Sequence, residues 1–417
     1  MSSLSSSSSP SFSSFSPFSP SSPSSSSPAA SADAAPSVAP AGPHVPDVSP
    51  TLAAYGWDDG FAESFAPYTA QGFTPGRIVR VDRGRVDAVV PDGAGVRTVL
   101  VDTAPVATGD PLRVPCTGDW AVIDLENGRV GPQLDGLVRA LLPRRTAFVR
   151  SASSKRSDGQ ILAANVDHAV TAVSLAEPLD LDRVERFVSL AWESGAQPLL
   201  ALTKADLVAD GACLAQLVAD VEGAAPGVPV LAVSAEAGEG VAELSAALTA
   251  GTAVLLGRSG AGKSTLANVL AGRPVQRVQA IRDRDGKGRH TTTTRDLLPL
   301  PGGGVLIDTP GLRGVGLYDA GSGLSRTFAD VEELAARCRF PDCAHGTEPD
   351  CAVRDAVEDG RLPVRRLDSY RKLQRENRRI VAKTDVRLRA EMRREWRLKQ
   401  AEGRERSARK RGTGRRG

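Results

Sequence analysis

Gly257-Arg258-Ser259-Gly260-Ala261-Gly262-Lys263-Ser264 has the pattern G-x-x-x-x-G-K-S of a phosphate-binding loop. An apolar run at 252–256 precedes the loop and predicts a strand, and residues 264–270 after it predict a helix. The glycines let backbone N–H groups turn inward around phosphates, Lys263 supplies charge to the β- and γ-phosphates, and the Ser264 hydroxyl can hold Mg²⁺. An ordinary glycine-rich turn is the alternative, but the flanking strand and helix favour nucleoside-triphosphate binding.

Two stretches downstream of this loop supply candidates for the γ-phosphate end of the site. Residues 286–295 read GKGRHTTTTR and have no burial pattern, and a threonine there is expected to complete a Mg²⁺ shell. The apolar strand 305–307 runs into Asp308-Thr309-Pro310-Gly311, a D-x-x-G motif. An acidic residue at the end of that strand can reach Mg²⁺ through water, and the Gly311 amide can reach a γ-phosphate.

Candidates for base recognition lie upstream of the loop. Thr203-Lys204-Ala205-Asp206 follows the apolar strand 198–202 and resembles the N-K-x-D element of GTPases, whose carboxylate accepts hydrogen bonds from guanine. Ser234-Ala235 follows the strand 228–233 and resembles their Ser-Ala element, whose backbone amide contacts guanine O6. Adenine lacks the donor pair that Asp206 would read, so guanine is favoured, although T-K-x-D alone is equally compatible with a helix N-cap. Thr203 stands where GTPases usually carry Asn, and it lacks the amide that braces the neighbouring loop.

These motifs together define the candidate nucleotide site. The residues expected to contact the nucleotide are Thr203, Lys204, Asp206, Ser234, Ala235, Gly257, Arg258, Ser259, Gly260, Ala261, Gly262, Lys263, Ser264, Thr265, Asp308 and Gly311. The residues expected to hold Mg²⁺ are Ser264, Thr292, Thr293 and Asp308.

The order of the motifs differs from that of common GTPases, in which the N-K-x-D and Ser-Ala elements come last. Here they precede the phosphate loop, and a circular permutation explains this, since domains whose termini lie close together tolerate it. The D-x-x-G motif therefore leads directly into the C-terminal part of the chain.

Four metal-ligating side chains lie close together near the C-terminal end. Cys338, Cys343, His345 and Cys351 fall within fourteen positions of a loop that also carries proline and glycine. Three thiolates and one imidazole fill the tetrahedral shell of Zn²⁺ and leave no open position, so a structural zinc ion is expected rather than a catalytic one. Coincidence or redox-active thiols are the alternatives.

Charge is distributed unevenly along the 417 residues. Residues 361–417 carry 22 Lys and Arg against 7 Asp and Glu, which suggests a polyanionic partner, with a merely solvated helix as the alternative. Leu367, Tyr370 and Leu373 lie on one face of an amphipathic helix there, surrounded by arginines that include Arg365 and Arg366. The arginine-rich end beyond it is expected to stay mobile until bound. No apolar run approaches the length of about 18 residues that suggests a membrane span.

The motif order and the zinc spacing together resemble the ribosome-small-subunit-dependent GTPase A family, over about residues 70–385. The resemblance implies an α/β P-loop GTPase domain, circularly permuted, between an N-terminal OB-type β-barrel and a C-terminal helical zinc-binding domain. The expected divisions are a disordered Ser/Pro/Ala-rich leader and linker at 1–68, the barrel at 69–140, the GTPase domain at 141–318, the zinc-binding domain at 319–386 and a basic tail at 387–417.

The resemblance also implies an activity and partners. The family hydrolyses GTP to GDP on the small (30S) ribosomal subunit during its late maturation, which implies Mg²⁺, one Zn²⁺ per subunit and contact with 16S rRNA. We expect a cytoplasmic monomer that does not bind membranes. Leu312 stands where many GTPases have a water-orienting glutamine, so hydrolysis without a partner should be slow. His290 resembles the switch histidine proposed for that role, and a solvent-exposed linker histidine is an equal alternative.

Two other functions are compatible with a phosphate loop. A phosphotransferase acting on a small metabolite would form ADP in the presence of its acceptor and show no guanine preference. An RNA-binding module with a regulatory nucleotide would bind without turnover, even on ribosomes. The phosphotransferase leaves the Asp206 element, the Cys/His cluster and the basic end unexplained.

Overall fold

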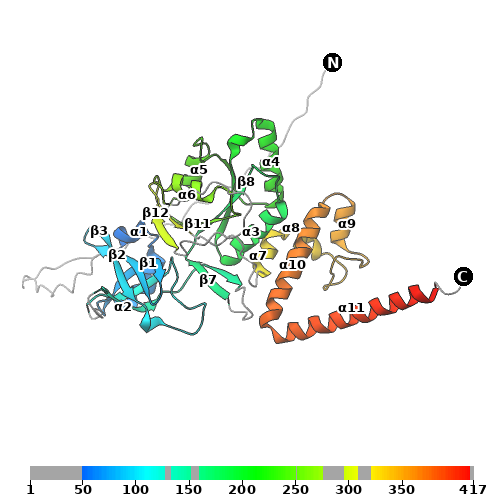
Figure 1. Ribbon diagram of the computed structural model, residues 1–417, viewed down its shortest axis with the longest axis horizontal. Coiled ribbons are helices and arrows are strands. Elements are labelled where there is room, and N and C mark those ends of the chain that lie inside the picture. The colour runs from blue at the N-terminus through cyan, green and yellow to red at the C-terminus, as the bar shows by residue number, and fades with distance from the viewer. Residues whose placement is uncertain are drawn as a thin grey trace, which may run out of the picture. The chain divides into compact units, whose positions relative to one another are not determined.

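The computed structural model describes residues 49–126, 133–151, 159–249, 251–275, 295–308 and 321–413. Along the chain these residues form a β-barrel, a helix-covered sheet and a group of C-terminal helices (Figure 1). The Ser/Pro-rich stretch 1–48, for which the composition predicts disorder, lies outside the described residues. Within them, no helix is long and apolar enough to cross a membrane.

Five strands close into a barrel in the order β1-β2-β3-β5-β4. They are β1 (Thr74–Asp82), β2 (Arg85–Asp92), β3 (Gly95–Asp102), β4 (Trp120–Asp124) and β5 (Gly136–Leu141), with a short 3₁₀ turn η1 (Ala104–Val106) after β3. Apolar side chains that alternate along the strands fill the interior, among them Ile78, Val86 and Val99, which have no exposed surface. The predicted barrel is confirmed, and β5 closes it by pairing with both β3 and β4.

Residues 49–68 differ from the prediction of a disordered leader, because they fold into two helices against the barrel. These are α1 (Ser49–Ala53) and α2 (Asp59–Thr69). Trp57, Phe61 and Phe65 recur every four residues and pack with Trp120 of β4, and the centroids of the two tryptophan rings lie 4.7 Å apart. Burying this aromatic stripe supplies the apolar contact that the Ser/Pro-rich composition upstream lacks.

The central sheet has six strands in the order β10-β9-β8-β11-β13-β12. They are β8 (His168–Ser174), β9 (Gln197–Thr203), β10 (Val230–Val233), β11 (Thr252–Leu256), β12 (Asp296–Pro299) and β13 (Val305–Asp308). Neighbouring strands are parallel except for β12 and β13. The predicted α/β domain is confirmed, and the antiparallel edge strand β12 is an addition to the prediction.

Helices cover both faces of this sheet. They are α3 (Leu181–Ser194), α4 (Gly211–Ala224), α5 (Val241–Ala247) and α6 (Lys263–Leu270), with a 3₁₀ turn η2 (Ala205–Leu207) after β9. Leu200 of β9 packs with Val184 of α3 and Val221 of α4, whereas Leu199, on the opposite face, packs with Leu244 of α5 and Leu266 of α6. A hairpin not predicted from the sequence, β6 (Ala147–Ser151) and β7 (Gly159–Ala164), links the barrel to the sheet along the chain.

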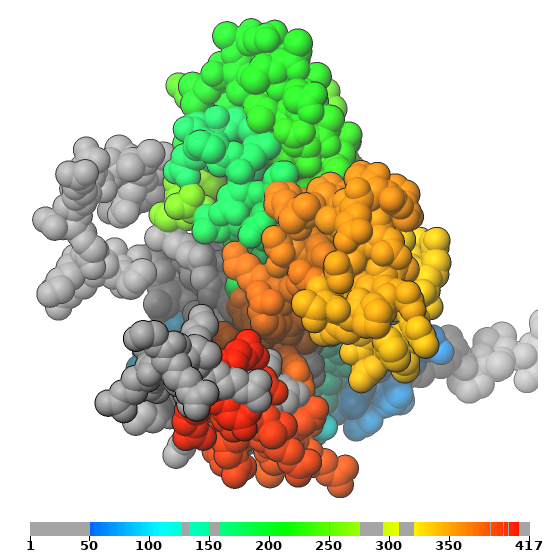
Figure 2. Space-filling model, turned by 90° about the vertical axis from the view of Figure 1, so that its right-hand side faces the viewer, coloured from blue at the N-terminus to red at the C-terminus, as the bar shows by residue number. Residues whose placement is uncertain are grey.

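The C-terminal region, residues 321–413, is helical. Its helices are α7 (Gly321–Thr327), α8 (Ala329–Ala335), α9 (Ala352–Glu358), α10 (Val364–Thr384) and α11 (Val386–Thr413). Leu367, Tyr370 and Leu373 of α10 are almost fully buried, which confirms the predicted apolar face. In Figure 2 the yellow and orange surface of α8 to α10 lies against the green surface of the helices on the central sheet, and the apolar cluster there includes Phe187 of α3.

Helix α11 lies where the sequence predicts a basic end that stays mobile until bound, and its helical conformation was not predicted. The chain is helical from Val386 to Thr413, and it leaves α10 at Asp385, whose carboxylate accepts hydrogen bonds from the Arg387 and Leu388 N–H groups. The side chains described beyond Glu391 are exposed, apart from the half-buried Met392. The sequence therefore forms a helix there without burying an apolar face.

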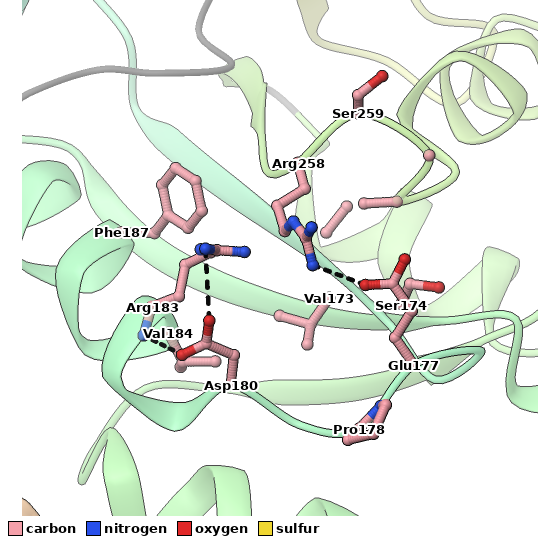
Figure 3. Close-up of a pocket in the computed structure, with 13 residues that line it drawn as sticks. Val173, Ser174, Glu177, Pro178, Asp180, Arg183, Val184, Phe187, Arg258 and Ser259 are labelled. Atoms are coloured by element: carbon pink, nitrogen blue, oxygen red, sulfur yellow. Dashed lines mark hydrogen bonds and ion pairs between the residues drawn. The ribbon is translucent and has the colours of Figure 1, made fainter. Parts of the chain in front are cut away.

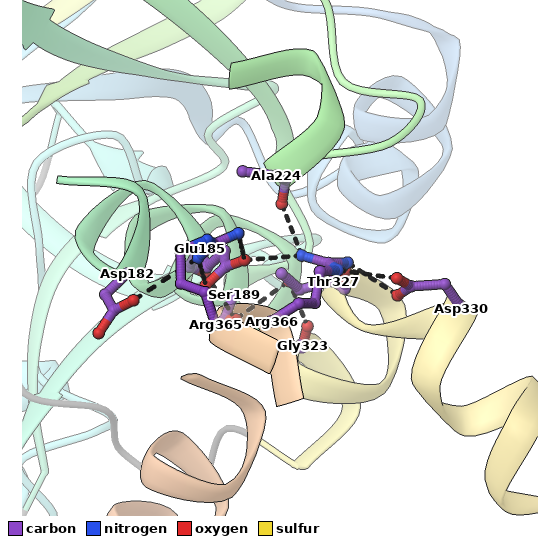
Figure 4. A network of polar contacts seen from close by, with 9 residues as sticks. All are labelled: Asp182, Glu185, Ser189, Ala224, Gly323, Thr327, Asp330, Arg365 and Arg366. Atoms are coloured by element: carbon purple, nitrogen blue, oxygen red, sulfur yellow. Dashed lines mark hydrogen bonds and ion pairs between the residues drawn. The ribbon is translucent and has the colours of Figure 1, made fainter. Parts of the chain in front are cut away.

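Arg366 joins α10 to the helices of the central sheet (Figure 4). Its five N–H groups all donate: two to Asp330, one to Glu185 of α3, and one each to the backbone carbonyls of Ala224 and Thr327, at 2.7–2.8 Å. Arg365 adds two hydrogen bonds to the same Glu185. Desolvation lowers the pKa of Arg366, but Asp330 and Glu185 outweigh it and hold that pKa above its ordinary value. Arg365 and Arg366 thus bind this protein's own carboxylates, which corrects their assignment to an RNA-facing surface.

Arg77 of β1 joins the barrel to the central sheet. Its side chain is 1% exposed, and Nη2 donates to the Asn165 carbonyl at 3.2 Å and to the Thr252 hydroxyl at 3.1 Å. The guanidinium lies 4.9 Å from the centroid of the Trp120 ring, and its Nε donates to none of the described residues. Burial lowers the pKa of Arg77 to about 10. The barrel is therefore attached by a buried cation that bonds to neutral oxygens.

Candidate functional site

The predicted phosphate loop connects β11 to α6 at the carboxyl end of the sheet. Gly257, Gly260 and Gly262 all have positive φ angles, a conformation that side-chain-bearing residues rarely adopt. At Gly257 a Cβ atom would also lie 2.5 Å from the carbonyl oxygen of Ala172 in β8. The backbone conformation of the loop therefore requires these glycines, in agreement with the predicted phosphate-binding loop.

Lys263 begins α6 and reaches back over this loop. Its ammonium donates to the carbonyl oxygens of Gly257, at 2.8 Å, and of Arg258. The positive charge is therefore held at the mouth of the loop, beside the first turn of α6, where Ser264 and Thr265 lie. The N–H groups at the start of a helix and a nearby ammonium form a natural anion site.

Thr203 connects the base-recognition element to the phosphate loop. Its hydroxyl donates to the carbonyl oxygen of Ala261 at 2.9 Å and lies 3.3 Å from that of Val173. One hydroxyl has one proton, so the shorter contact is the hydrogen bond. Thr203 lacks the amide of the usual asparagine, but its hydroxyl reaches the carbonyl of the phosphate loop directly.

Asp206 and Ser234 come together although 28 positions separate them. Strands β9 and β10 are parallel with Thr203 opposite Val233, so the segments that follow them leave the sheet side by side. The Ser234 hydroxyl, fully buried, donates to Asp206 Oδ1 at 2.6 Å and accepts from the Ala237 N–H group at 3.0 Å. This bond fixes one carboxylate oxygen of Asp206. The sequence pointed only to backbone contacts from Ser234-Ala235, and a serine side chain there is the signal for this second role.

The magnesium candidates are only partly within the described residues. Asp308 ends β13, which lies beside β11 with Ile307 opposite Val254, so its backbone is at the same edge of the sheet as the phosphate loop. The candidate residues His290, Thr292, Thr293 and Gly311, together with Leu312, lie outside the described residues.

The four predicted metal ligands converge in the loop between α8 and α9. The ligand atoms of Cys338, Cys343, His345 and Cys351 all lie within 4.8 Å of one another. The Sγ atoms of Cys338 and Cys351 are 3.8 Å apart, and His345 Nδ1 lies 3.6 and 3.5 Å from them. A tetrahedral ion with bonds of about 2.3 Å separates its sulfur ligands by about 3.8 Å, so the donor set fits zinc. Burial lowers the pKa of His345, which favours the neutral imidazole that binds metals.

Comparisons with known proteins place the chain among GTPases. Residues 141–318 match the sequence model of the RsgA GTPase family. "Small ribosomal subunit biogenesis GTPase RsgA" of Streptomyces coelicolor is 65% identical over 361 residues, 87% of this chain and 96% of that protein. Its counterpart in Streptomyces avermitilis is 63% identical over 87% of this chain and 95% of that protein.

Solved structures resemble the fold. YjeQ from Thermotoga maritima has a TM-score of 0.54 and 24% identity, covering 73% of this chain and 98% of its own. YloQ, described as a circularly permuted GTPase, has a TM-score of 0.54 and 23% identity, covering 74% of this chain and 96% of its own. The permuted arrangement predicted from the motif order is confirmed.

Proposed function

Because the chain belongs to the RsgA GTPase family, we propose that it binds the small ribosomal subunit and hydrolyses GTP there during late assembly. The observation that carries this proposal is the extent of the likeness: 65% identity over nearly the whole of a relative named for small-subunit biogenesis. The geometry agrees with it, since the phosphate loop, Thr203 and the Asp206–Ser234 pair meet at one edge of the sheet.

For the nucleotide we propose a division of roles between the two sides of this edge. The loop from Gly257 to Thr265 would hold the phosphates, with Lys263 turning from its backbone acceptors to the β- and γ-phosphates. Lys204 and Asp206 would recognise guanine, and the bond from Ser234 would orient the Asp206 carboxylate toward the base. The residues proposed for Mg²⁺ are Ser264, Thr292 or Thr293, and Asp308.

Hydrolysis is proposed to depend on the ribosome. Leu312, directly after the D-x-x-G motif, has an apolar side chain that cannot orient a water molecule. His290 is proposed for that task, and contact with the 30S subunit would bring it into place. Bound GDP, in contrast, needs only the loop and the base-recognition element.

A structural zinc ion is proposed at Cys338, Cys343, His345 and Cys351. The spacing of the four donor atoms supports it, and the ion would hold the loop between α8 and α9 by four bonds. Elemental analysis of the purified protein should find about one zinc per chain. Folded protein without zinc, or zinc retained by Cys343→Ser in full amount, would refute the site.

For the contact with 16S rRNA we propose the barrel and the C-terminal helices. Arg393, Arg397 and Arg404 are exposed and spaced by four and seven residues, which places them on one face of α11. Glu391 and Glu402 lie on the opposite face. Arg394 and Arg406 are exposed on other sides of α11, so the helix carries basic side chains around its circumference, which suits the phosphates of an RNA backbone.

The remaining proposals concern organisation. We propose domain limits of 69–140 for the barrel, 141–318 for the GTPase domain and 319–386 for the zinc-binding domain, with α1 and α2 added to the barrel and 387–417 as a basic extension. Assembly of ribosomal subunits takes place in the cytoplasm of bacteria, and we propose that the protein acts there as a monomer.

GTP turnover with and without purified 30S particles tests the function. We expect slow turnover alone and stimulation by 30S particles of at least about tenfold, with 50S particles as the control. Lys263→Ala should abolish the stimulated rate because it removes the charge from the phosphate loop. Turnover unaffected by 30S particles, or faster with ATP than with GTP, would contradict the proposal.

A further inference from the structure

A cavity of about 50 Å³ lies between the phosphate loop and the first turns of α3 (Figure 3). Val173 of β8 and Val184 and Phe187 of α3 contribute apolar surface, and loop residues Arg258–Ala261 form the facing wall. Such a volume accommodates about three to five water molecules, or the head and first atoms of a small organic ligand. The cavity therefore shares the wall Arg258–Ala261 with the proposed phosphate site, whereas Lys204, Asp206, Ser234 and Lys263 do not line it.

Two arginines reach into this cavity from its two walls. In Figure 3 the guanidinium groups of Arg183, on α3, and Arg258, on the phosphate loop, extend toward the same space. Each is paired with one carboxylate of the turn between β8 and α3: Arg183 with Asp180 at 3.4 Å, and Arg258 with Glu177 at 2.6 Å. The four charges therefore balance, and both guanidinium groups keep further N–H groups for a ligand.

One of these N–H groups lacks an acceptor. Arg183 Nη1 is buried and donates to none of the described residues, although its neighbour Nη2 pairs with Asp180. A buried donor without an acceptor costs free energy that a ligand oxygen recovers on binding. The gain in binding free energy is largest for an anion, because hydrogen bonds between a guanidinium and an oxyanion are about twice as strong as hydrogen bonds between neutral groups.

We propose that this cavity is a second anion site, which binds a small organic anion with its carboxylate or phosphate head between Arg183 and Arg258. The apolar stem of the ligand lies against Val173 and Phe187. Glu177 and Asp180 share the same guanidinium groups, so a simple anion binds with a dissociation constant on the order of millimolar. Since Arg258 belongs to the phosphate loop, the anion and the nucleotide alter each other's affinity by the same factor.

Saturation-transfer NMR on the full chain loaded with GDP and Mg²⁺ tests the site, since the bound nucleotide then fills the phosphate loop. The probes are isobutyrate, ethyl phosphate and the neutral, equally shaped isobutyramide. We expect at least one of the two anions to bind and the amide not to, and the anion that binds more tightly identifies the head group. Equal binding of isobutyrate and isobutyramide, or no binding of either anion up to about 100 mM, would overturn the proposal.

Two substitutions in one helix provide the matched comparison. Arg183→Leu removes the buried donor and should weaken the anion by about tenfold, whereas GDP affinity shows that the protein remains folded. Arg186→Leu removes the same charge from α3 at a position that pairs with Glu376 of α10, outside the cavity, and should leave the anion affinity unchanged. Equal weakening by both variants means a general charge effect and rejects the site. If GDP fails to bind the wild type, the nucleotide assignment is wrong, and the same two variants without GDP still decide the anion site.

Discussion

A buried arginine lies at the contact of the central sheet with the barrel, Arg77, and another at its contact with the C-terminal helices, Arg366, and the two are bonded in opposite ways. Arg366 donates all five N–H groups and faces Glu185 and Asp330. Arg77 donates to a carbonyl and a hydroxyl, and among the described residues no carboxylate forms an ion pair with it. The carboxylates around Arg366 raise its pKa, whereas burial lowers the pKa of Arg77.

The difference in bonding determines how strongly a substitution of each arginine destabilises the fold. A buried charge network is destabilised most when one partner is removed, because the partner groups remain buried without compensation. A buried cation bonded to neutral oxygens leaves only neutral groups behind when it is replaced. Replacing the arginine at the C-terminal attachment should therefore destabilise the fold more than replacing the arginine at the barrel attachment.

Replacing Arg366 should have the largest effect. Arg366→Leu leaves Glu185, which is fully buried, without one of its two arginine partners, and it strips Asp330 as well. We expect a loss of about 3–5 kcal/mol in the free energy of unfolding, measured by denaturant titration. The double variant with Glu185→Leu is the control, and it should recover part of the loss. A loss below about 1 kcal/mol in the single variant would show that the network contributes little.

Replacing Arg77 should have a smaller effect. Arg77→Met keeps an apolar stem beside Trp120 and leaves two neutral oxygens without a donor. We expect the free energy of unfolding to fall by less than about 2 kcal/mol, because the desolvation cost of the cation disappears at the same time. The measurement is the same denaturant titration as for Arg366. A loss equal to that of Arg366→Leu would remove the distinction between the two attachments.

The smallest effect is expected at the edge of the barrel attachment. Arg80 of β1 donates two hydrogen bonds of 2.6 Å to Asp296 of β12, but the two side chains are 43% and 33% exposed. Arg80→Ala should cost less than about 1 kcal/mol, and the cost should shrink further in 1 M salt. Thermal unfolding at low and high salt measures it. A cost that does not depend on salt would point to packing of the arginine stem instead of its charge.

Local patterns allowed much of the fold and the site to be predicted. The phosphate loop and the Cys/His cluster occupy short stretches in which neighbouring residues carry the pattern, and the strands of the barrel alternate visibly. Helix α2 was not predicted, because the Ser/Pro-rich composition before it favours disorder more strongly than its aromatic spacing favours a helix.

Long-range pairing accounts for the remaining differences. Arg365 and Arg366 look like part of a basic surface until Glu185, about 180 positions earlier in the chain, is placed beside them. Charge counted along a sequence does not show which groups neutralise one another in space. The bond between Ser234 and Asp206 likewise depends on the register of two parallel strands, which no local motif states.

Helix α3 contacts both the cavity beside the phosphate loop and the C-terminal helix α10. Val184 and Phe187 line the cavity beside the phosphate loop, while Glu185 and Arg186 hold α10 through Arg366 and Glu376. These four consecutive residues occupy about one turn of α3, so the same turn contacts the cavity on one side and α10 on the other. The cavity beside the phosphate loop and the C-terminal helices are therefore separated by the width of a single helix, about 10 Å.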